Sequence, residues 1–192
     1  MSEHHVPASL HHEVIIAGFG GQGVLTLGST LAEAAVLDGR EVVWTPAYGA
    51  EMRGGPAFCT VIVSSAPIGS PVVATADTAI VMDRLSLPKY QRQVRPDGAL
   101  LVNSSLVDTA EIAVAARWYA IRANHLAEAL GDARTANMVM LGAFLALTRL
   151  VRAAAVVDAL RHILPARRHH LIPLNEAALA AMNSLSSLVG VV

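Results

Sequence analysis

A glycine-rich turn follows an apolar run and precedes an amphipathic helix near the start of the chain. The run Glu13–Ala17 (Glu-Val-Ile-Ile-Ala) predicts a strand covered on both faces. Gly-Phe-Gly-Gly-Gln-Gly follows at 18–23, and apolar residues then recur at helical spacing over 24–37. Gly39 is well placed to end that helix, and 41–45 reads as a second strand. We therefore predict a βαβ unit whose first turn is rich in glycine.

The rest of the chain continues to alternate strands and helices. We expect strands over 57–64, 77–82, 99–103 and 117–121, a loop over 46–55, and helices over 85–94, 122–130, 136–151, 156–164 and 173–188. This alternation predicts an α/β fold: a three-layer, Rossmann-like domain with a mostly parallel sheet and extra C-terminal helices. We assign one domain to 13–192 and a flexible, His-rich tail to 1–12.

Composition narrows the class of partner. The chain has 192 residues, of which 54% are hydrophobic and 15% charged, with a formal net charge of −1. This balance gives no electrostatic case for nucleic acid. A surface so poor in charge is typical of a chain covered by a protein partner, and it predicts a homodimer when the chain is isolated. An alanine-rich composition bias is the alternative. We find no convincing signal peptide or membrane span, and we expect a cytoplasmic location.

The glycine turn is a candidate anion site. Gly18, Gly20 and Gly23 match the G-x-G-x-x-G spacing, and a helix N-terminus offers free N–H groups to an anion. A dinucleotide site also needs an acid at the end of the second strand, but that strand ends in Trp-Thr-Pro. The side-chain amide of Gln22 can bind a ligand or a neighbouring chain. Close packing of helix against strand, without any ligand, is the alternative reading of the glycines.

A second candidate lies after the second strand, at the edge where α/β folds place their sites. Tyr48 can stack and form hydrogen bonds, and Arg53 can clamp a phosphate or carboxylate. Glu51 pairs with Arg53 or faces a partner, and glycines beside Arg53 expose the backbone. The alternative is a solvated turn with a weak Glu–Arg ion pair.

Catalytic and metal-binding patterns are missing from the sequence. There is no Gly-x-Ser-x-Gly and no His-Glu-x-x-His segment, and the single cysteine, Cys59, cannot ligate an iron–sulfur cluster or a zinc ion alone. We expect Cys59 to be a buried strand thiol, and we assign no catalytic residue and no metal ligand. From its residues alone, the chain resembles an α/β binding subunit more than a complete enzyme.

Several motifs together resemble the gamma subunit of 2-oxoacid:ferredoxin oxidoreductases. They are Gly-Phe-Gly-Gly-Gln-Gly-Val at 18–24, Ala-Tyr-Gly-Ala-Glu-Met-Arg-Gly-Gly at 47–55, Ser-Ala-Pro-Ile-Gly-Ser-Pro at 65–71, Leu-Leu-Val-Asn-Ser-Ser-Leu at 100–106, Ala-Asn-Met-Val-Met-Leu-Gly-Ala at 136–143 and Leu-Ile-Pro-Leu-Asn-Glu-Ala-Ala-Leu at 171–179. The resemblance runs from about residue 13 to 188. Several motifs in this order are far more specific than the glycine turn alone.

The resemblance implies a part in a larger enzyme. Complete enzymes of this family oxidatively decarboxylate a 2-oxoacid, form an acyl-CoA and reduce ferredoxin. Thiamine diphosphate, magnesium and iron–sulfur clusters then belong to partner subunits, either alpha and beta or alpha, beta and delta. The resemblance also implies that this chain alone binds no cofactor and is inactive when isolated. The equivalent domain is associated with coenzyme A and subunit packing. The residues carried over for such contacts are Gly18, Gly20, Gly21, Gln22, Gly23, Tyr48, Glu51, Arg53, Gly54 and Gly55.

The motif forms at 47–55 and 103–105 are most similar to the 2-oxoglutarate and branched-chain types, so we expect 2-oxoglutarate as the substrate. Two alternatives stay open. A stand-alone nucleotide-dependent oxidoreductase predicts tight NAD or NADP binding by the isolated chain. A purely structural interaction subunit predicts that Gln22 and Arg53 can be changed without loss of activity.

Overall fold

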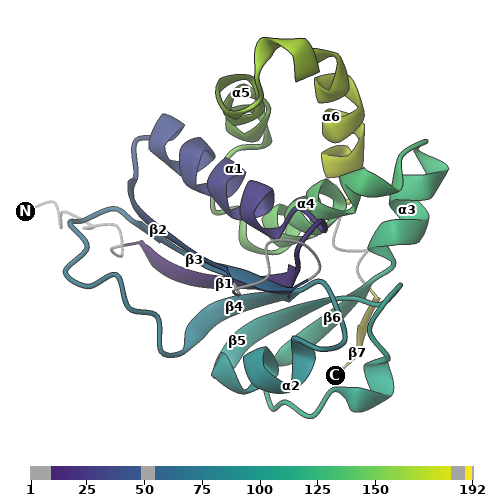
Figure 1. The fold of residues 1–192 in the computed structure, drawn as a ribbon. Helices are drawn as coiled ribbons and strands as arrows, with labels where there is room; N and C mark the ends of the chain where they lie inside the picture. The colour runs from purple at the N-terminus through teal and green to yellow at the C-terminus, as the bar shows by residue number, and fades with distance from the viewer. Residues whose placement is uncertain (1–9, 49–54, 183–188, 192) are drawn as a thin grey trace, which may run out of the picture.

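A computed structural model describes residues 10–48, 55–182 and 189–191 and places seven strands in one sheet (Figure 1). The strands are β1 His11–Phe19, β2 Glu41–Tyr48, β3 Pro56–Ser64, β4 Ala76–Val81, β5 Val94–Asn103, β6 Arg117–Ile121 and β7 Val189–Val191. The α-helices are α1 Val24–Leu37, α2 Leu87–Tyr90, α3 Ala123–Ala129, α4 Ala136–Thr148, α5 Ala153–Ile163 and α6 Ile172–Ala180. Short 3₁₀ helices are η1 Gln91–Gln93, η2 Thr109–Glu111, η3 Ala133–Thr135 and η4 Ala166–Leu171.

The strand order is β2-β3-β1-β4-β5-β6-β7. The pairs β1–β4, β4–β5 and β5–β6 are parallel, whereas β3 is antiparallel to both β1 and β2, and β7 is antiparallel to β6. Five of the seven strands therefore run in one direction, which confirms a mostly parallel sheet. The predicted βαβ unit is split, because β3 lies between its two strands.

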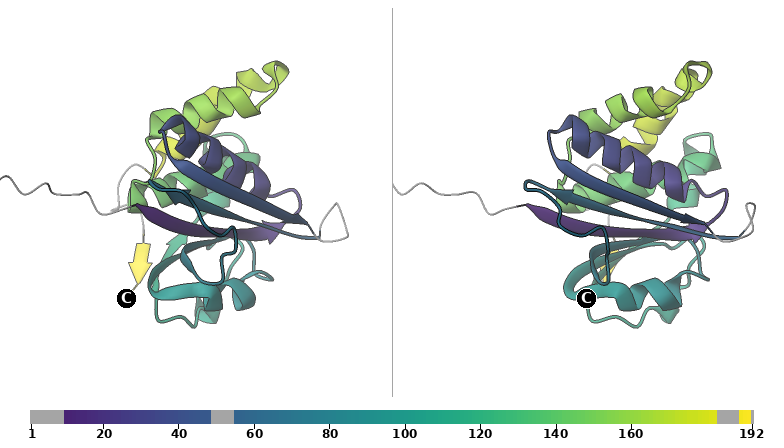
Figure 2. Two further views of the ribbon diagram at one scale, coloured as in Figure 1. Left: turned by 90° about the vertical axis from the view of Figure 1, so that its left-hand side faces the viewer. Right: turned by 60° about the vertical axis from the view of Figure 1, so that its left-hand side comes forward.

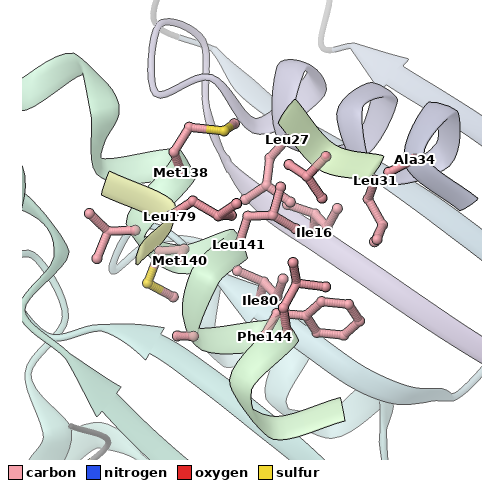
Figure 3. Close-up of a cluster of buried hydrophobic side chains, with 14 of the residues drawn as sticks. Ile16, Leu27, Leu31, Ala34, Ile80, Met138, Met140, Leu141, Phe144 and Leu179 are labelled. Carbon is pink, nitrogen blue, oxygen red and sulfur yellow. The ribbon is translucent and has the colours of Figure 1, made fainter. Parts of the chain in front are cut away.

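The helices α1, α4, α5 and α6 lie on one face of the sheet (Figures 1 and 2). Every residue of α4 from Ala136 to Leu145 is buried, which is why this helix is apolar all round. Ile16 of β1, Leu27 and Leu31 of α1, and Phe144 of α4 are fully buried where these elements meet (Figure 3). The carboxyl ends of the strands are thus held on a rigid, well-packed scaffold.

The opposite face has a thinner cover. There α2, η1 and connecting segments pack against the sheet through a second apolar cluster that includes Ile15, Leu87, Tyr90 and Leu100 (Figure 2). The helix expected over 85–94 is wrong in length, because only Leu87–Tyr90 is α-helical and β5 already begins at Val94. Among the described helices, none is long and apolar enough to cross a membrane.

Two boundaries near the chain ends differ from expectation. The predicted tail over 1–12 is too long, because β1 begins at His11 and pairs with β3 along its full length. His12 is half-buried, with its ring 5.9 Å from that of Phe144, and burial lowers the pKa of its imidazole. The helix expected over 173–188 ends at Ala180, and β7 is an additional strand.

Candidate functional site

The carboxyl ends of β1, β4, β5 and β6 meet at one edge of the sheet because these strands are parallel neighbours. The segment 18–23 begins with the last two residues of β1 and leads directly into the N-terminus of α1. This is the edge at which open α/β sheets bind ligands.

Two glycines of the turn allow close packing. A Cβ atom at Gly18 would collide with Gln22 and would lie 2.8 Å from the Cβ of Met82. Gly23 has a φ of +74°, and a Cβ there would lie 2.5 Å from Nδ2 of Asn137 on α4. The inner side of the turn is therefore filled by protein atoms. The alternative prediction, that the glycines allow close packing of helix against strand, therefore applies to Gly18 and Gly23.

The tip of the turn faces outward. Gly21 has a φ of +105° and is exposed, and no atom of a described residue lies within 4 Å of the position that a Cβ would occupy. A side chain at this position would be strained by the backbone angle, although there is room for it. The tip at Gly21 is therefore open to a ligand or partner on the side that the described residues leave free.

Gln22 ties the turn to the neighbouring strand. Its Oε1 accepts a hydrogen bond from the Phe19 N–H at 3.0 Å, and its Nε2 donates to the Met82 carbonyl at 3.1 Å. The side chain predicted to reach a ligand thus points into the fold and fixes the shape of the turn. One amide hydrogen is left for a further partner.

The structure brings the two predicted binding segments together. The N–H of Gly20 donates to the carbonyl of Gly55 at 2.9 Å, so the glycine turn touches the residue just before β3. Tyr48 is the last residue of β2 and pairs with Ala57 of β3. The predicted residues Glu51, Arg53 and Gly54 lie outside the described residues.

The sequence analysis did not identify a buried asparagine at the edge formed by the carboxyl ends of the parallel strands. Asn103, the last residue of β5, is fully buried. Its Nδ2 donates to the Met82 carbonyl at 3.3 Å and to Oδ1 of Asn124 at 2.7 Å, and its Oδ1 accepts from the Ser105 N–H at 3.3 Å. The sequence does contain a signal for this residue, because a polar side chain directly follows the apolar run 99–102 at the expected end of a strand.

A second polar group continues this network toward solvent. Ser105 Oγ accepts a hydrogen bond from the Asn124 N–H at 3.2 Å and lies 3.0 Å from Nδ1 of His125. His125 is exposed and Ser105 is half-buried. The loop after β5 is therefore joined to the start of α3, and the network presents an imidazole at the surface of the edge.

The start of α1 has the properties of an anion-binding helix terminus. Gly23 precedes the helix and provides no side-chain cap, and no acidic residue lies in the first turn. The first N–H groups of such a helix lack intrahelical partners and carry partial positive charge. These features fit a phosphate or carboxylate, and they supply binding and orientation without an acid–base or nucleophilic group.

Cys59 is a buried strand thiol, as predicted. It is fully buried between β3 and α1, and its Sγ lies 3.7 Å from the Val24 carbonyl oxygen. Burial raises the pKa of this thiol to about 12. The thiolate is the reactive form of cysteine, so Cys59 is inert at neutral pH. Among the described residues, no three His, Cys, Asp or Glu side chains gather as a metal-ligand group.

The split βαβ unit weighs against a classical dinucleotide site. In that site the strand beside β1 carries an acid at its carboxyl end for the ribose hydroxyls. Here the strand beside β1 on that side is β3, which is antiparallel and begins at this edge with Pro56. The strand β2, which also lacks the acid, is one position further away.

Comparisons with known proteins agree on one group. The model of the family described as pyruvate ferredoxin/flavodoxin oxidoreductase matches residues 13–183. A ketoisovalerate oxidoreductase subunit VorA from Methanothermobacter thermautotrophicus is 44% identical over 134 residues, which are 70% of this chain and 28% of that protein. The chain thus spans little more than a quarter of the length of this relative.

Two further proteins match over most of their own length. A 2-oxoglutarate synthase subunit KorC from the same organism is 37% identical over 160 residues, covering 80% of this chain and 85% of that subunit. The crystal structure of a keto/oxoacid ferredoxin oxidoreductase gamma subunit from Geobacter sulfurreducens is 29% identical, with a TM-score of 0.79, and the match covers 93% of this chain and 99% of that one.

Proposed function

The chain belongs to the pyruvate ferredoxin/flavodoxin oxidoreductase family, and we propose that it is the gamma subunit of a 2-oxoacid:ferredoxin oxidoreductase. The observation that carries this proposal is the end-to-end likeness to a single gamma subunit, in which 93% of this chain covers 99% of the other. The complex as a whole would oxidatively decarboxylate a 2-oxoacid, form an acyl-CoA and pass electrons to ferredoxin.

In this proposal the redox chemistry resides in partner subunits. A cluster needs several cysteine thiolates, whereas this chain has one cysteine, which is buried and protonated at neutral pH. The partner subunits, either alpha and beta or alpha, beta and delta, would hold thiamine diphosphate, magnesium and the iron–sulfur clusters. The described site supports a binding and positioning role for this chain.

We propose that the edge around the glycine turn contacts coenzyme A, another subunit, or both. The uncapped start of α1 and the open Gly21 tip suit the phosphates of coenzyme A. Arg53 follows β2 by a few residues and is the cation that we assign to such a phosphate. The variant R53A then raises the Michaelis constant for coenzyme A in the assembled enzyme, and an unchanged constant in an intact complex would remove this role.

We propose 2-oxoglutarate as the substrate, because the KorC relative has nearly the same extent as this chain. A branched-chain 2-oxoacid is the second candidate, because the VorA relative has the higher identity of 44%. The test is a screen of the purified complex for coenzyme A-dependent ferredoxin reduction with 2-oxoglutarate, 2-ketoisovalerate and pyruvate. We expect the highest kcat/KM for 2-oxoglutarate, and a higher value for 2-ketoisovalerate would establish the second candidate.

A further inference from the structure

The molecule has a groove of about 1100 Å³ that is separate from the glycine turn. It is lined by the C-terminal end of α1 and the residues that follow it, by the second half of α4 and the segment that leads to α5, and by the end of α6. Its apolar lining includes Leu145, Leu150, Leu179 and Met182, all of which are largely buried. Apolar side chains thus form part of the groove lining.

A close helix crossing fixes the position of α6 against α4. A Cβ atom at Gly142 of α4 would overlap the carbonyl oxygen of Leu179 on α6, so only glycine permits this approach. Gly142 and Leu179 both line the groove. The close approach of the α4 and α6 backbones therefore helps to set the position of these two lining residues.

The groove is positively charged. Its lining contains four charged residues, Asp38, Arg40, Arg149 and Arg152. Asp38 already has a partner, since its carboxylate accepts hydrogen bonds from the backbone N–H of Arg152 at 2.8 Å and from its Nε at 2.7 Å. Arg40 and Arg149 form no ion pair with a described residue. Two guanidinium groups therefore remain for an external acid, in a chain with a net charge of −1.

The backbone of Arg149 gives an independent observation. This residue ends α4 with φ 51° and ψ 30°, and it is the one non-glycine residue with a positive φ in the described part of the chain. Glycine is the usual residue at such a helix end, because it has no Cβ penalty. The structure keeps an exposed arginine side chain at a strained position on the rim of the groove.

We propose that this groove binds an acidic segment of a partner subunit, with carboxylates on Arg40 and Arg149 and an apolar side chain between them. The choice of a protein segment rests on the proposed subunit function. In the VorA relative the matching region is 28% of a longer chain, so further polypeptide is covalently linked to it in that protein. A gamma subunit that is a separate chain contacts its partner subunits noncovalently. Complementary charges on the two surfaces then fix how the partner segment is oriented in the groove.

Peptide binding to the full-length chain tests this inference without enzyme activity. The probe is a fluorescent peptide of alternating leucine and glutamate, and its control is the same peptide with lysine in place of glutamate. We expect the acidic peptide to bind at least about tenfold more tightly than the lysine peptide, and to weaken as salt is raised to 0.5 M, because exposed ion pairs are screened at about that concentration.

Variants of one residue separate charge from fold. We expect R149G to weaken binding about tenfold, the loss of about one charge-assisted hydrogen bond, while Tm is unchanged or higher because the strain is relieved. R149K keeps the charge and most of the affinity. R167A, which removes an arginine from the exposed η4 segment outside the groove, leaves binding unchanged.

Several results would overturn the inference. Equal binding of the lysine peptide, or unchanged affinity in R149G, would show that the two arginines do not recognise an acid. Complete displacement of the peptide by 1 mM inorganic pyrophosphate would identify a site for free anions. A homodimer in sedimentation that R149G dissociates would identify a second copy of this chain as the occupant. Absence of acidic-peptide binding to the isolated full-length chain, when the multisubunit complex can still be purified, would contradict this inference alone and leave the proposed function standing.

Discussion

Gln22 and Asn103 donate hydrogen bonds to the same acceptor, the carbonyl oxygen of Met82. Nε2 of Gln22 lies 3.1 Å from this oxygen and Nδ2 of Asn103 lies 3.3 Å from it. The residue after β4 thus holds both the glycine turn after β1 and the polar network after β5. The geometry of the candidate site depends on side-chain amides that join three loops.

Asn103 is the more important of the two for stability. We expect N103A to lower the free energy of unfolding by about 3 kcal/mol, because the fully buried Asn103 side chain forms three hydrogen bonds, with the Met82 carbonyl, Asn124 Oδ1 and the Ser105 N–H, and all three are lost. Q22A should cost only about 1 kcal/mol, because Gln22 is half-buried and water can replace its amide. Urea unfolding of both variants measures the difference, and an equal or larger loss in Q22A would contradict this assignment.

Thr30 offers a stabilising substitution. It is fully buried in α1, and its Oγ1 has no hydrogen-bond partner among the described residues. T30V has nearly the same shape without the hydroxyl, so we expect it to raise the free energy of unfolding by about 1 kcal/mol.

Thr135 is the matched control for this substitution. It is also buried, but its Oγ1 donates to the Asp132 carbonyl at 2.8 Å, so T135V should lower stability by about 1 kcal/mol. Destabilisation by T30V of the same size as T135V would show that the Thr30 hydroxyl has a partner in solution.

Cys59 makes stability depend on alkaline pH. Burial raises the pKa of its thiol from 9.0 to about 12, so the folded state keeps a proton that the unfolded chain releases above pH 9. This contribution is complete below pH 9 and is lost as the pH rises from 9 toward 12. Between pH 8 and pH 10, the wild type should therefore lose about 1 kcal/mol more stability than C59A.

The same thiol should be protected from reagents. We expect no reaction of Cys59 with a thiol-specific disulfide reagent at pH 8 in the native chain and complete reaction in 8 M urea. A fast native reaction, or identical pH slopes for the wild type and C59A, would mean that Cys59 is accessible and would contradict the buried position.

The sequence predicted where the strands lie along the chain better than it predicted which strands are neighbours in the sheet. The apolar runs after residue 13 and after residue 56 correctly indicate strands, because buried strands need apolar side chains on both faces. Periodicity says nothing about which strand lies beside which, so the antiparallel insertion of β3 between β1 and β2 was not predictable. The strand β7 has three residues, which is too few for a pattern.

Only those parts of the candidate site whose residues are adjacent in the sequence could be predicted. The glycine turn was visible because its spacing, the preceding strand and the following helix are adjacent in the sequence. The contacts of Asn103 with Met82 and Asn124 depend on the order β4-β5-β6, which brings three separate loops together. The inward direction of Gln22 likewise follows from the position of β4.

The measurement that tests the central claim most directly is purification of the tagged chain from its native host without oxygen, followed by mass identification of the chains that accompany it. The account predicts larger partner subunits with thiamine diphosphate, iron–sulfur absorbance and 2-oxoacid-dependent reduction of ferredoxin. A stable, partner-free 20.1 kDa chain that carries a bound nucleotide would contradict it.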